Sequence, residues 1–480
     1  MSKTFYITTT LPYVNANLHI GHALEFIRVD TIARYKKLAG FDVFFNSGTD
    51  EHGMKIYEKA KEIGKSPKQF VDEAFEKFKE QTHSFGISED VHFVRTTDER
   101  HEKSAQNFWQ KVSKNGFIYK KNYKTKYCIG CEEEKTDSDL VDGKCPIHPN
   151  RELEVIEEEN YFFSFSKFQK PLLDFYEKNP DFVIPKFRYN EVISFVKHGL
   201  RDFSISRLKS KMPWGIPVPE DGEHVMYVWF DALTSYISTL GWGTDNEKDF
   251  NKYWINGTPT QYCGKDNTRF QAIMWQAMLM AAEIPNTYQI VVNGHITADG
   301  GIKMSKSLGD VVDPKEISAE YGVDALRCFL LGEVSNFEDS PFSRERFKDS
   351  YNAKLANGLG NLVSRIMKMA QDNLEKTPEI PEKNIPQEFF NYLENFEINK
   401  AVEFIWNEIA SMDKFIQENQ PFKVIKIDKK AGQEMISSLV IRLYSIAKML
   451  NPILPETSVK IKELVKQNKT PEVPLFARKD

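Results

Sequence analysis

The first 45 residues alternate between two hydrophobic periods, which predicts a strand, a helix and a second strand. Residues 4–10 (TFYITTT) are β-branched or aromatic, as strand residues commonly are. Apolar residues then recur at helical spacing through residues 21–38, and Gly40 follows as a helix stop. Residues 41–45 (FDVFF) have the composition of the next strand. A strand–helix–strand unit of this length joins parallel strands, so we expect a parallel sheet.

This alternation stops near residue 119 and resumes near residue 225. Residues 119–165 are rich in Tyr, Lys and Cys and lack a helical period, which indicates an inserted module. Residues 225–231 (VMYVWFD) and 289–293 (QIVVN) are predicted strands, and residues 268–282 between them are a predicted apolar helix. We therefore expect a parallel sheet whose sequence is split by an insertion.

Beyond about residue 343 only helical periods remain. Residues 399–416 carry Val402, Ile405 and Ile409 on one face of a predicted amphipathic helix. The proline-rich residues 377–386 join two helical stretches. The predicted fold class is therefore α/β with a split parallel sheet, followed by an all-α bundle.

The composition is that of a folded protein with an ample core. The chain has 480 residues, 41% of them hydrophobic, with 35 Phe and 19 Tyr, which excludes intrinsic disorder. No run of 18 apolar residues occurs, so we expect no membrane span. The N-terminus begins with a strand rather than a signal peptide, so we expect a cytoplasmic protein. A net charge of −5 does not favour nucleic-acid binding, so such a partner needs local basic surface.

Three of the five cysteines fall in one short segment that has metal-ligand spacing. Cys128 and Cys131 form one Cys-x2-Cys pair, and Cys145 and His148 form a second pair of the type Cys-x2-His. Four such ligands predict a closed, structural Zn²⁺ site. The alternative is that His148 caps a turn between Pro146 and Pro149 and that the site is degenerate.

The segment His19-Ile20-Gly21-His22 lies between the first predicted strand and helix. Ligands of open α/β sheets bind beyond the carboxyl ends of the strands, and a helix N-terminus offers N–H groups and a positive dipole to phosphate. Gly21 allows a nucleotide to approach the backbone, and the histidines can donate hydrogen bonds to phosphate oxygens. The alternative is a pair of structural histidines at a helix start.

The segment Lys303-Met304-Ser305-Lys306-Ser307 follows a glycine-rich stretch at residues 299–301. Two lysines on a mobile loop suit a phosphoryl group in transfer, because each places a point charge on a flexible stem. The alternative is a solvated basic loop. The two motifs together, in this order, are more specific than either alone.

With these two motifs the chain resembles the class I aminoacyl-tRNA synthetases, and the methionyl-tRNA synthetases in particular. Four further segments resemble that family: residues 10–15 (TLPYVN), 48–53 (GTDEHG), 227–232 (YVWFDA) and 361–365 (NLVSR). The resemblance covers nearly the whole chain. It implies a Rossmann catalytic domain in two halves (1–114 and 225–294), a zinc-bearing connective insertion (115–224), a KMSKS loop and stem-contact region (295–350), and a helical anticodon-binding domain (351–480).

The resemblance implies a methionine–tRNA ligase. The carboxylate of L-methionine attacks the α-phosphate of ATP, which carries Mg²⁺, and the methionyl-adenylate then passes its methionine to the terminal adenosine of tRNA-Met. No protein nucleophile is required, so catalysis is positioning and charge stabilisation. The matched catalytic residues are His19, His22, Lys303 and Lys306. The matched ATP-binding residues are His19, Gly21, His22, Gly264, Asp266, Gly294 and Lys306.

The methionine pocket is also matched residue by residue, with one departure. Asp50 matches the carboxylate near the substrate ammonium, and Leu11, Tyr13, Trp229 and Tyr236 match the walls around the thioether. Aromatic edges attract sulfur, which fits this role, although Trp229 could also be ordinary strand core. Asp231 is expected to orient pocket groups rather than act as a base. Gln271 stands where the family commonly has His, and Asn267 where it has an aliphatic residue.

Recognition of the anticodon is implied for the helical region. Asn361 and Arg365 are four residues apart and share a helix face. Phe422 follows Pro421 where the family usually has a tryptophan that stacks on the first anticodon base, and the alternative is that Phe422 is buried core. The lysine runs at residues 120–126 and 423–430 are either tRNA contacts or solvated faces.

Several other functions share part of this pattern. Leucyl, isoleucyl and valyl synthetases have a large editing insertion, whereas only about 110 residues separate the two sheet halves here. A cysteinyl enzyme would distribute its zinc ligands around the catalytic pocket. A non-catalytic RNA-binding paralogue and an adenylate-forming ligase without tRNA are the remaining alternatives, and ATP–pyrophosphate exchange followed by tRNA charging separates them. We expect a monomer.

Overall fold

The computed structural model describes residues 3–131, 133–135, 137–298, 312–381 and 385–479. The chain divides into two compact units that are interleaved in sequence. The first unit contains residues 1–17, 41–80 and 90–292, and the second contains residues 18–40, 81–89 and 293–480. None of the helices in the described ranges is both long and apolar enough to span a bilayer.

A six-stranded sheet forms the centre of the first unit, with the strand order β3-β2-β1-β12-β13-β7. The pairs of β1 with β2 and β12, of β2 with β3, and of β13 with β7 are all parallel. The predicted parallel sheet is therefore confirmed, and so is its division along the sequence. The sheet strands are β1 (Thr4–Thr8), β2 (Asp42–Thr49), β3 (His92–Arg95), β7 (Val183–Ile184), β12 (Thr258–Gly264) and β13 (Gln289–Asn293).

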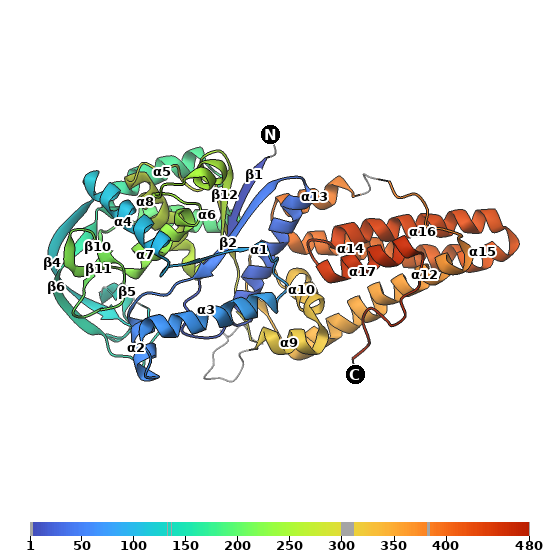
Figure 1. The fold of residues 1–480 in the computed structure, drawn as a ribbon, viewed down its shortest axis with the longest axis horizontal. Coiled ribbons are helices and arrows are strands. Elements are labelled where there is room, and N and C mark those ends of the chain that lie inside the picture. Colours follow the sequence, from blue (N-terminus) through green and yellow to red (C-terminus); the bar gives the residue numbers. More distant parts are fainter. Residues whose placement is uncertain (1–2, 132, 136, 299–311, 382–384, 480) are drawn as a thin grey trace. The chain divides into compact units, whose positions relative to one another are not determined.

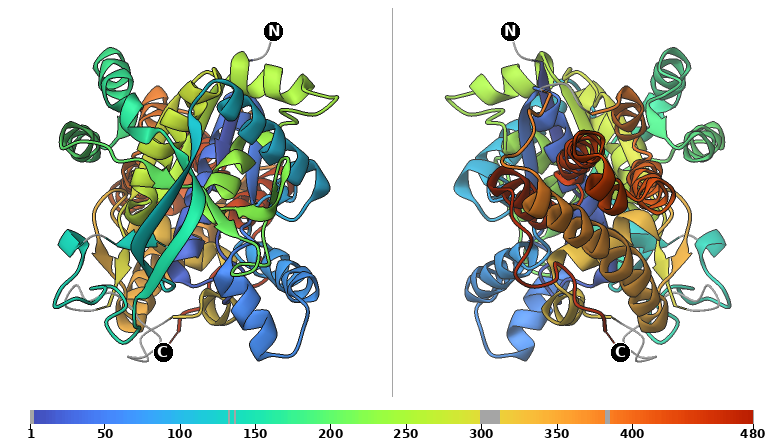
Figure 2. Two further views of the ribbon diagram at one scale, coloured as in Figure 1. Left: turned by 90° about the vertical axis from the view of Figure 1, so that its left-hand side faces the viewer. Right: turned by 90° about the vertical axis from the view of Figure 1, so that its right-hand side faces the viewer.

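The inserted segment forms antiparallel sheets of its own. Strands β4 and β6 pair over ten residues, and Figure 2 shows them as a long twisted ribbon. Strand β7, however, comes from the middle of the same segment and adds an edge strand to the parallel sheet. The antiparallel strands are β4 (Ile118–Cys128), β5 (Glu133–Lys135), β6 (Glu154–Phe163), β8 (Phe203–Ser204), β9 (Ser206–Leu208), β10 (Pro217–Val218) and β11 (Asp221–Met226).

Helices of the first unit cover the parallel sheet and bury a large aromatic core, in which Trp275 and Tyr176 are fully buried. The α-helices are α2 (Met54–Glu62), most of α3 (Pro67–His83), α4 (Glu99–Lys114), α5 (Gln169–Lys178), α6 (Lys186–Lys197), α7 (Val228–Ser238) and α8 (Trp275–Ala281). The shorter helical segments are η1 (Asp137–Asp139), η2 (Phe165–Phe168), η3 (Phe250–Ile255), η4 (Lys265–Asn267) and η5 (Phe270–Met274).

One predicted strand is wrong. Residues 225–231 do not form a strand, because β11 ends at Met226 and α7 begins at Val228. A short apolar run fits either a strand or a buried helix, and here Tyr227 is the extended residue that caps the helix. The predicted helix over residues 268–282 is present, but it is divided into the π-helical segment η5 and α8.

Beyond residue 343, the elements of the second unit in the described part of the chain are helices, as predicted. Helices α12, α14, α16 and α17 run alongside one another in Figure 1, and the apolar stripe of α14 faces inward, with Ile405, Ile409 and Met412 buried. The elements are α1 (Ile20–Leu38), β14 (Ile296–Thr297), α9 (Pro314–Tyr321), α10 (Val323–Gly332), β15 (Ser340–Pro341), α11 (Arg344–Ser350), η8 (Tyr351–Gly360), α12 (Asn361–Asn373), α13 (Gln387–Glu394), α14 (Ile398–Asn419), α15 (Pro421–Ile427), α16 (Lys429–Leu450) and α17 (Pro455–Gln467).

Candidate functional site

A pocket lies where strands β1, β2 and β12 of the first unit end. This is the edge at which open α/β sheets bind their ligands. Five of the six residues predicted to bind methionine line this pocket, although they come from four separate segments of the chain. The lining residues are Thr10, Leu11, Asp50, Trp229, Ala232, Leu233, Tyr236, Asn267, Phe270 and Gln271.

One wall of the pocket is the inward face of α7. Trp229, Ala232, Leu233 and Tyr236 have the spacing of a single helix face. The ring of Trp229 stacks on Phe270 with 3.8 Å between ring centroids and an angle of 7° between the planes. Two stacked aromatic rings offer a polarisable surface that suits a thioether.

Asp50, at the carboxyl end of β2, is the buried carboxylate of the pocket. It is 3% exposed, and its backbone N–H donates to the carbonyl of Pro12. A carboxylate in this position can bind the ammonium group of an amino acid through a charge-assisted hydrogen bond. Tyr13, the sixth predicted residue, forms a β-bridge with Asp50 but does not line the pocket, and Lys55 lies 5.1 Å from its ring centroid.

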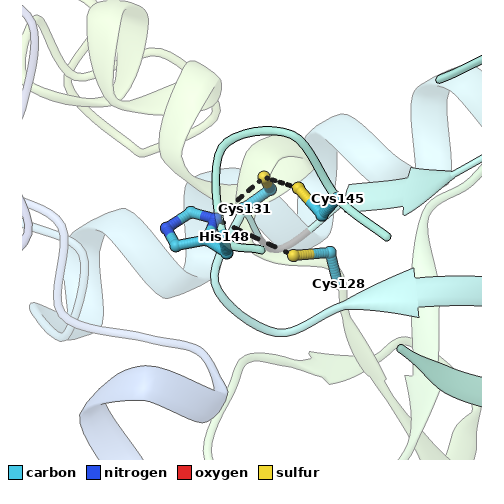
Figure 3. A group of neighbouring side chains, drawn as sticks. All are labelled: Cys128, Cys131, Cys145 and His148. Carbon is cyan, nitrogen blue, oxygen red and sulfur yellow. Dashed lines mark hydrogen bonds between the residues drawn. The ribbon is translucent and has the colours of Figure 1, made fainter. Parts of the chain in front are cut away.

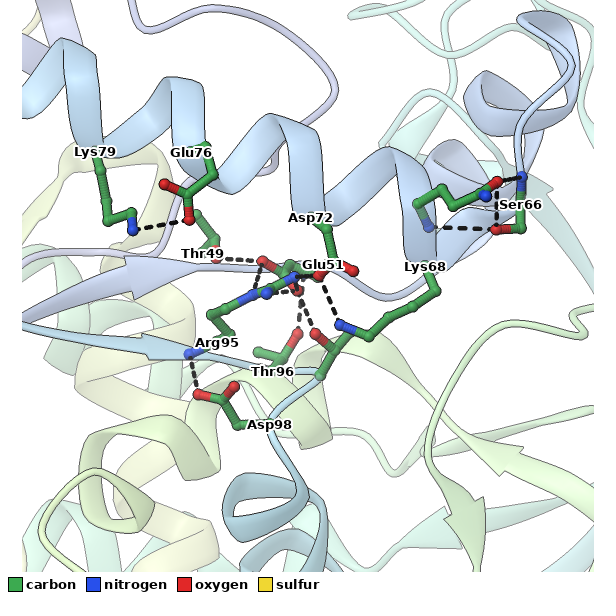
Figure 4. A network of polar contacts seen from close by, with 12 residues as sticks. Thr49, Glu51, Ser66, Lys68, Asp72, Glu76, Lys79, Arg95, Thr96 and Asp98 are labelled. Atoms are coloured by element: carbon green, nitrogen blue, oxygen red, sulfur yellow. Dashed lines mark hydrogen bonds and ion pairs between the residues drawn. The ribbon is translucent and has the colours of Figure 1, made fainter.

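A charged network holds the backbone next to Asp50 (Figure 4). Arg95 donates to both carboxylate oxygens of Glu51 at 2.8–3.1 Å and to Asp72 at 2.6 Å. The hydroxyl of Thr49 donates to Glu51 at 2.6 Å, and Thr97 also donates to it. Glu51 is fully buried, so these donors offset the cost of its burial. The network therefore fixes the chain that carries Asp50.

Asp231 lies on α7 behind the pocket, between two buried histidines. Its carboxylate accepts hydrogen bonds at 2.7 Å from Nδ1 of His52 and from Nε2 of His101, and Ser238 pairs with the other nitrogen of His101 at 2.8 Å. Burial alone would raise the pKa of Asp231, but the two histidines outweigh it and hold that pKa below its ordinary value. Asp231 thus ties α7 to the segment after β2 and to α4, and its orienting role stays a prediction.

Gln271 enters the pocket wall from η5 and is 1% exposed. Its Nε2 donates to the hydroxyl of Thr10 at 2.9 Å, and its Oε1 accepts from Gln261 at 3.4 Å. The carboxamide is therefore held at both ends by neutral partners.

The two motif histidines lie at the N-terminus of α1, in the second unit. The Nδ1 of His19 accepts from the backbone N–H of Gly21 at 3.1 Å, and the Nδ1 of His22 accepts from the backbone N–H of His19 at 3.2 Å. A ring nitrogen that accepts carries no proton, so in the neutral form each ring has its N–H at Nε2. Burial, together with the neighbouring His19, lowers the pKa of His22 to about 3. His22 is therefore a neutral N–H donor at physiological pH.

Buried charges fix the position of α1 within the second unit. Asp30 and Arg327 are both fully buried and form an ion pair at 2.8 Å, and Arg34 approaches the same carboxylate at 2.7 Å. The other oxygen of Asp30 accepts from the backbone N–H of Ser88 at 2.9 Å. Arg28, also fully buried, donates to three backbone carbonyls between residues 334 and 336. α1 is thus fastened by charged side chains that bind other parts of the same unit.

The remaining predicted nucleotide-binding residues have different placements. Gly264 and Asp266 lie at the carboxyl end of β12, in the first unit. Gly294 follows β13 in the second unit, and a Cβ there would come within 2.1 Å of the carbonyl oxygen of Glu338, so only glycine fits. Lys303 and Lys306 lie outside the described residues.

The predicted zinc ligands converge at the end of β4 (Figure 3). The ligand atoms of Cys128, Cys131, Cys145 and His148 all lie within 4.8 Å of one another. Cys131 Sγ is 3.5 Å from Cys145 Sγ and 3.3 Å from His148 Nδ1. Tetrahedral Zn²⁺ ligands at bond lengths near 2.3 Å are about 3.7 Å apart, so the group fits a zinc ion. A Cβ at Gly130 would lie 2.5 Å from the His148 ring, so glycine makes this approach possible.

Known proteins match almost the whole chain. The family model described as tRNA synthetases class I (M) matches residues 5–153 and 138–367. A methionine–tRNA ligase of Caldanaerobacter subterraneus is 42% identical, over 96% of this chain and 74% of that protein. A methionine–tRNA ligase of Rickettsia felis is 40% identical, over 98% and 93%. The chain belongs to the class I methionyl-tRNA synthetases.

The structure of the synthetase agrees with this assignment. A solved Mycobacterium tuberculosis methionyl-tRNA synthetase in complex with methionyl-adenylate has a TM-score of 0.89 and 35% identity, over 96% of this chain and 93% of that one. The apo form of the same enzyme has a TM-score of 0.84 and 31% identity. The leucyl, isoleucyl, valyl and cysteinyl alternatives are therefore set aside, since these relatives are named as methionine–tRNA ligases and methionyl-tRNA synthetases.

The residues of the synthetase that were predicted to read the anticodon lie on two helices of the second unit. Asn361 and Arg365 occupy the first turns of α12, where Arg365 pairs with Asp413 at 2.8 Å. Phe422 lies in the first turn of α15 and is 43% exposed, so it is not a core residue. The lysines at residues 423, 426, 429 and 430, which follow it in the sequence, are exposed. In the other lysine run, Lys120, Lys124 and Lys126 each pair with an acidic residue, which favours an ordinary solvated face.

Five pocket residues of the synthetase were not predicted: Thr10, Ala232, Leu233, Asn267 and Phe270. The missed signal was helical spacing, because positions 229, 232, 233 and 236 share one face only if α7 is a helix. The strand assignment for residues 225–231 hid that face. Asn267 was noted only as a departure from the family pattern, and it does line the pocket.

Proposed function

We propose that this synthetase activates methionine with ATP to give methionyl-adenylate and pyrophosphate, and then transfers the methionine to the 3′-terminal adenosine of tRNA-Met. The observation that carries the proposal is the pocket at the carboxyl ends of β1, β2 and β12. It combines one buried carboxylate with an aromatic and aliphatic wall and two carboxamides, those of Asn267 and Gln271. That is the donor set which an α-amino acid with an uncharged thioether side chain requires.

In this proposal Asp50 binds the substrate ammonium, while Leu11, Trp229 and Tyr236 surround the thioether. Gln271 contributes the polar group nearest the side chain. Tyr13 borders the site through its bridge to Asp50 rather than as a wall residue.

The phosphates of ATP are assigned to His19 and His22, with Gly21 between them. Both rings present Nε2–H donors, and neutral donors stabilise the charge that develops on phosphate oxygens without requiring a proton transfer. Lys303 and Lys306 are assigned to the same phosphates, and Gly264, Asp266 and Gly294 to the nucleoside. Mg²⁺ is expected to accompany ATP and to neutralise part of the phosphate charge.

Zinc is proposed for the Cys128, Cys131, Cys145 and His148 group, as a structural ion that orders the segment after β4. All four positions are filled by protein ligands, so no position is left open for a substrate. We expect about one zinc ion per chain by elemental analysis of protein purified without added metal. A folded, active and zinc-free preparation would remove the ion from the proposal.

The helical residues 351–480 are assigned to anticodon binding through Asn361, Arg365 and Phe422. An exposed aromatic ring that is followed in the sequence by exposed lysines has the chemistry of a stacking platform for an unpaired base, and one such contact is worth about 1–3 kcal/mol.

The proposal is tested by two assays on the full-length protein. ATP–pyrophosphate exchange with each amino acid in turn should respond to methionine above all others, and charging should then require tRNA-Met. Phe422→Ala should raise the Michaelis constant for tRNA-Met about 5- to 150-fold and leave exchange near wild type. Exchange driven by another amino acid would refute the substrate, and a parallel fall of exchange and charging in Phe422→Ala would refute the anticodon role.

A further inference from the structure

A line of six polar side chains runs through the interior of the first unit and ends at the pocket. Five hydrogen bonds connect its members, and the four central ones are at most 1% exposed. No member carries a charge. In order toward the pocket the members are Asn286, Gln276, Thr287, Gln261, Gln271 and Thr10.

The far end of this line is fixed by the backbone. The N–H of Thr287 donates to Oε1 of Gln276 at 3.1 Å, and Nε2 of Gln276 donates to the backbone carbonyl of Gln271 at 2.8 Å. A backbone N–H cannot accept and a carbonyl cannot donate. The carboxamide of Gln276 therefore has only one allowed orientation, with its Nε2 toward the hydroxyl of Thr287 at 3.1 Å.

That orientation is passed from residue to residue. The hydroxyl of Thr287 accepts from Gln276, so its own proton goes to Oε1 of Gln261 at 2.7 Å. Nε2 of Gln261 then faces Oε1 of Gln271 at 3.4 Å. If the carboxamide of Gln271 were flipped, two NH₂ groups would face each other in a buried site, and an unsatisfied buried donor is costly. The donors and acceptors along these six side chains therefore have only one possible arrangement.

The consequence at the pocket is a donor of fixed position. Nε2 of Gln271 uses one proton for the hydroxyl of Thr10 at 2.9 Å. An amide nitrogen has a second proton, and Gln271 lines the pocket. This donor does not titrate, unlike the histidine that is common in the family at this position.

We propose that Gln261, Thr287 and Gln276 are positioning residues that hold an N–H of Gln271 toward the side chain of the substrate. The inference rests on the proposed function, because it takes methionine as that substrate. A thioether sulfur is a weak acceptor for an N–H, whereas norleucine has the same length with a methylene in place of the sulfur. The fixed donor favours methionine, since norleucine leaves it buried without a partner.

Thr287→Val tests this arrangement, because it removes the hydroxyl and keeps the shape of the side chain. We measure kcat/KM for methionine and for norleucine by ATP–pyrophosphate exchange in the full-length protein. The methionine-to-norleucine ratio should fall several-fold, by up to about tenfold, through a higher KM for methionine at nearly unchanged kcat. The matched control is Thr260→Val on the same strand as Gln261. Its buried hydroxyl donates only to the carbonyl of Thr258 at 3.3 Å, and its ratio should stay at the wild-type value.

Each outcome decides the point. An unchanged ratio in an active Thr287→Val protein overturns the positioning role, and so does an equal change in Thr260→Val. If Thr287→Val does not fold, Gln261→Met removes the next donor at similar volume and carries the same expected loss. If the wild-type protein shows no exchange with methionine, the proposed function itself fails, and this result is distinct from an unchanged ratio.

Discussion

Two buried polar networks in this synthetase differ in charge. The network around α1, in the second unit, is built from Asp30, Arg327 and Arg34, and it includes a fully buried ion pair at 2.8 Å. The second network is the line of six side chains from Asn286 to Thr10 in the first unit, and its members are carboxamides and hydroxyls. The first holds the helix that starts with the motif histidines, and the second holds a single side chain.

The difference shows what each kind of network can do. A charged pair in a dry interior is expensive to separate, so it fixes the position of a whole helix, but its strength depends on protonation. Carboxamides gain less from each hydrogen bond, yet each has a distinct donor end and acceptor end, so a chain of them transmits orientation. We therefore expect large, pH-dependent effects from the first network and small, pH-independent effects from the second.

The largest effect is expected for Asp30→Ala. The variant leaves Arg327 buried without its carboxylate, and loss of one partner of a buried ion pair costs about 3–5 kcal/mol. Urea unfolding measures this loss in the free energy of unfolding. Glu316→Ala is the matched control in the same unit, because Glu316 pairs with Arg344 at the surface and should cost at most about 1 kcal/mol. Similar losses in the two variants would show that the buried ion pair of Asp30 contributes no more to stability than a surface ion pair does.

The stability supplied by Asp30 should also depend on pH. Burial would raise the pKa of Asp30, but Arg327 and Arg34 outweigh burial and hold it below the ordinary value. A carboxylate with a lowered folded-state pKa contributes its full stability above the unfolded pKa, near 4, and loses it as the pH falls through the folded value. The gap in unfolding free energy between wild type and Asp30→Ala should therefore be constant from about pH 5 to 7 and shrink below about pH 4. A gap that widens in acid would contradict this sign.

Neither network could be predicted from the sequence, although much of the fold could. The strands on either side of residues 21–38 were predicted from their β-branched and aromatic composition, and the helices over residues 21–38 and 399–416 from periodicity. Only the second of these helices buries a single face, because α1 is buried on nearly all sides. Five of the ten pocket residues were found through the resemblance of their segments to family motifs. Asp30 and Arg327, by contrast, are almost 300 residues apart, and a single sequence carries no signal for such a pair. The strand predicted at residues 225–231 was wrong because a run of six apolar residues does not distinguish a strand from a buried helix.

The first unit also contains a charged network, the one around Glu51. A variant of this network tests whether charge, or the unit in which a network lies, determines the size of the effect. Arg95→Gln removes the bidentate partner of the buried Glu51, and hydrogen bonds to charged groups are worth about 1.5–3 kcal/mol each. We expect a loss of about 2–3 kcal/mol in unfolding free energy. We also expect a raised KM for methionine, because Glu51 directly follows Asp50 in the chain. Pyrophosphate exchange at varied methionine, with varied ATP as the control, measures the second effect. If Arg95→Gln lost as little stability as a surface pair does, the difference between the two networks would come from the unit in which each lies and not from its charge.

The smallest effect is expected for Thr287→Val in the uncharged network. The substitution deletes one hydroxyl that both accepts from Gln276 and donates to Gln261, and leaving buried amide groups without a partner costs about 1–3 kcal/mol. Asn286 and the backbone N–H of Thr287 still hold Gln276, so we expect the loss to lie near the lower end of that range. None of the six members titrates between pH 3 and 9, so the loss should be the same at every pH at which the protein is folded. Unfolding in urea at the pH values used for Asp30→Ala gives the direct comparison. If the Thr287→Val loss changed with pH as the Asp30→Ala loss does, the six uncharged side chains would be coupled to a titrating group. The proposed difference between a charged network that fixes position and an uncharged one that fixes orientation would then be wrong.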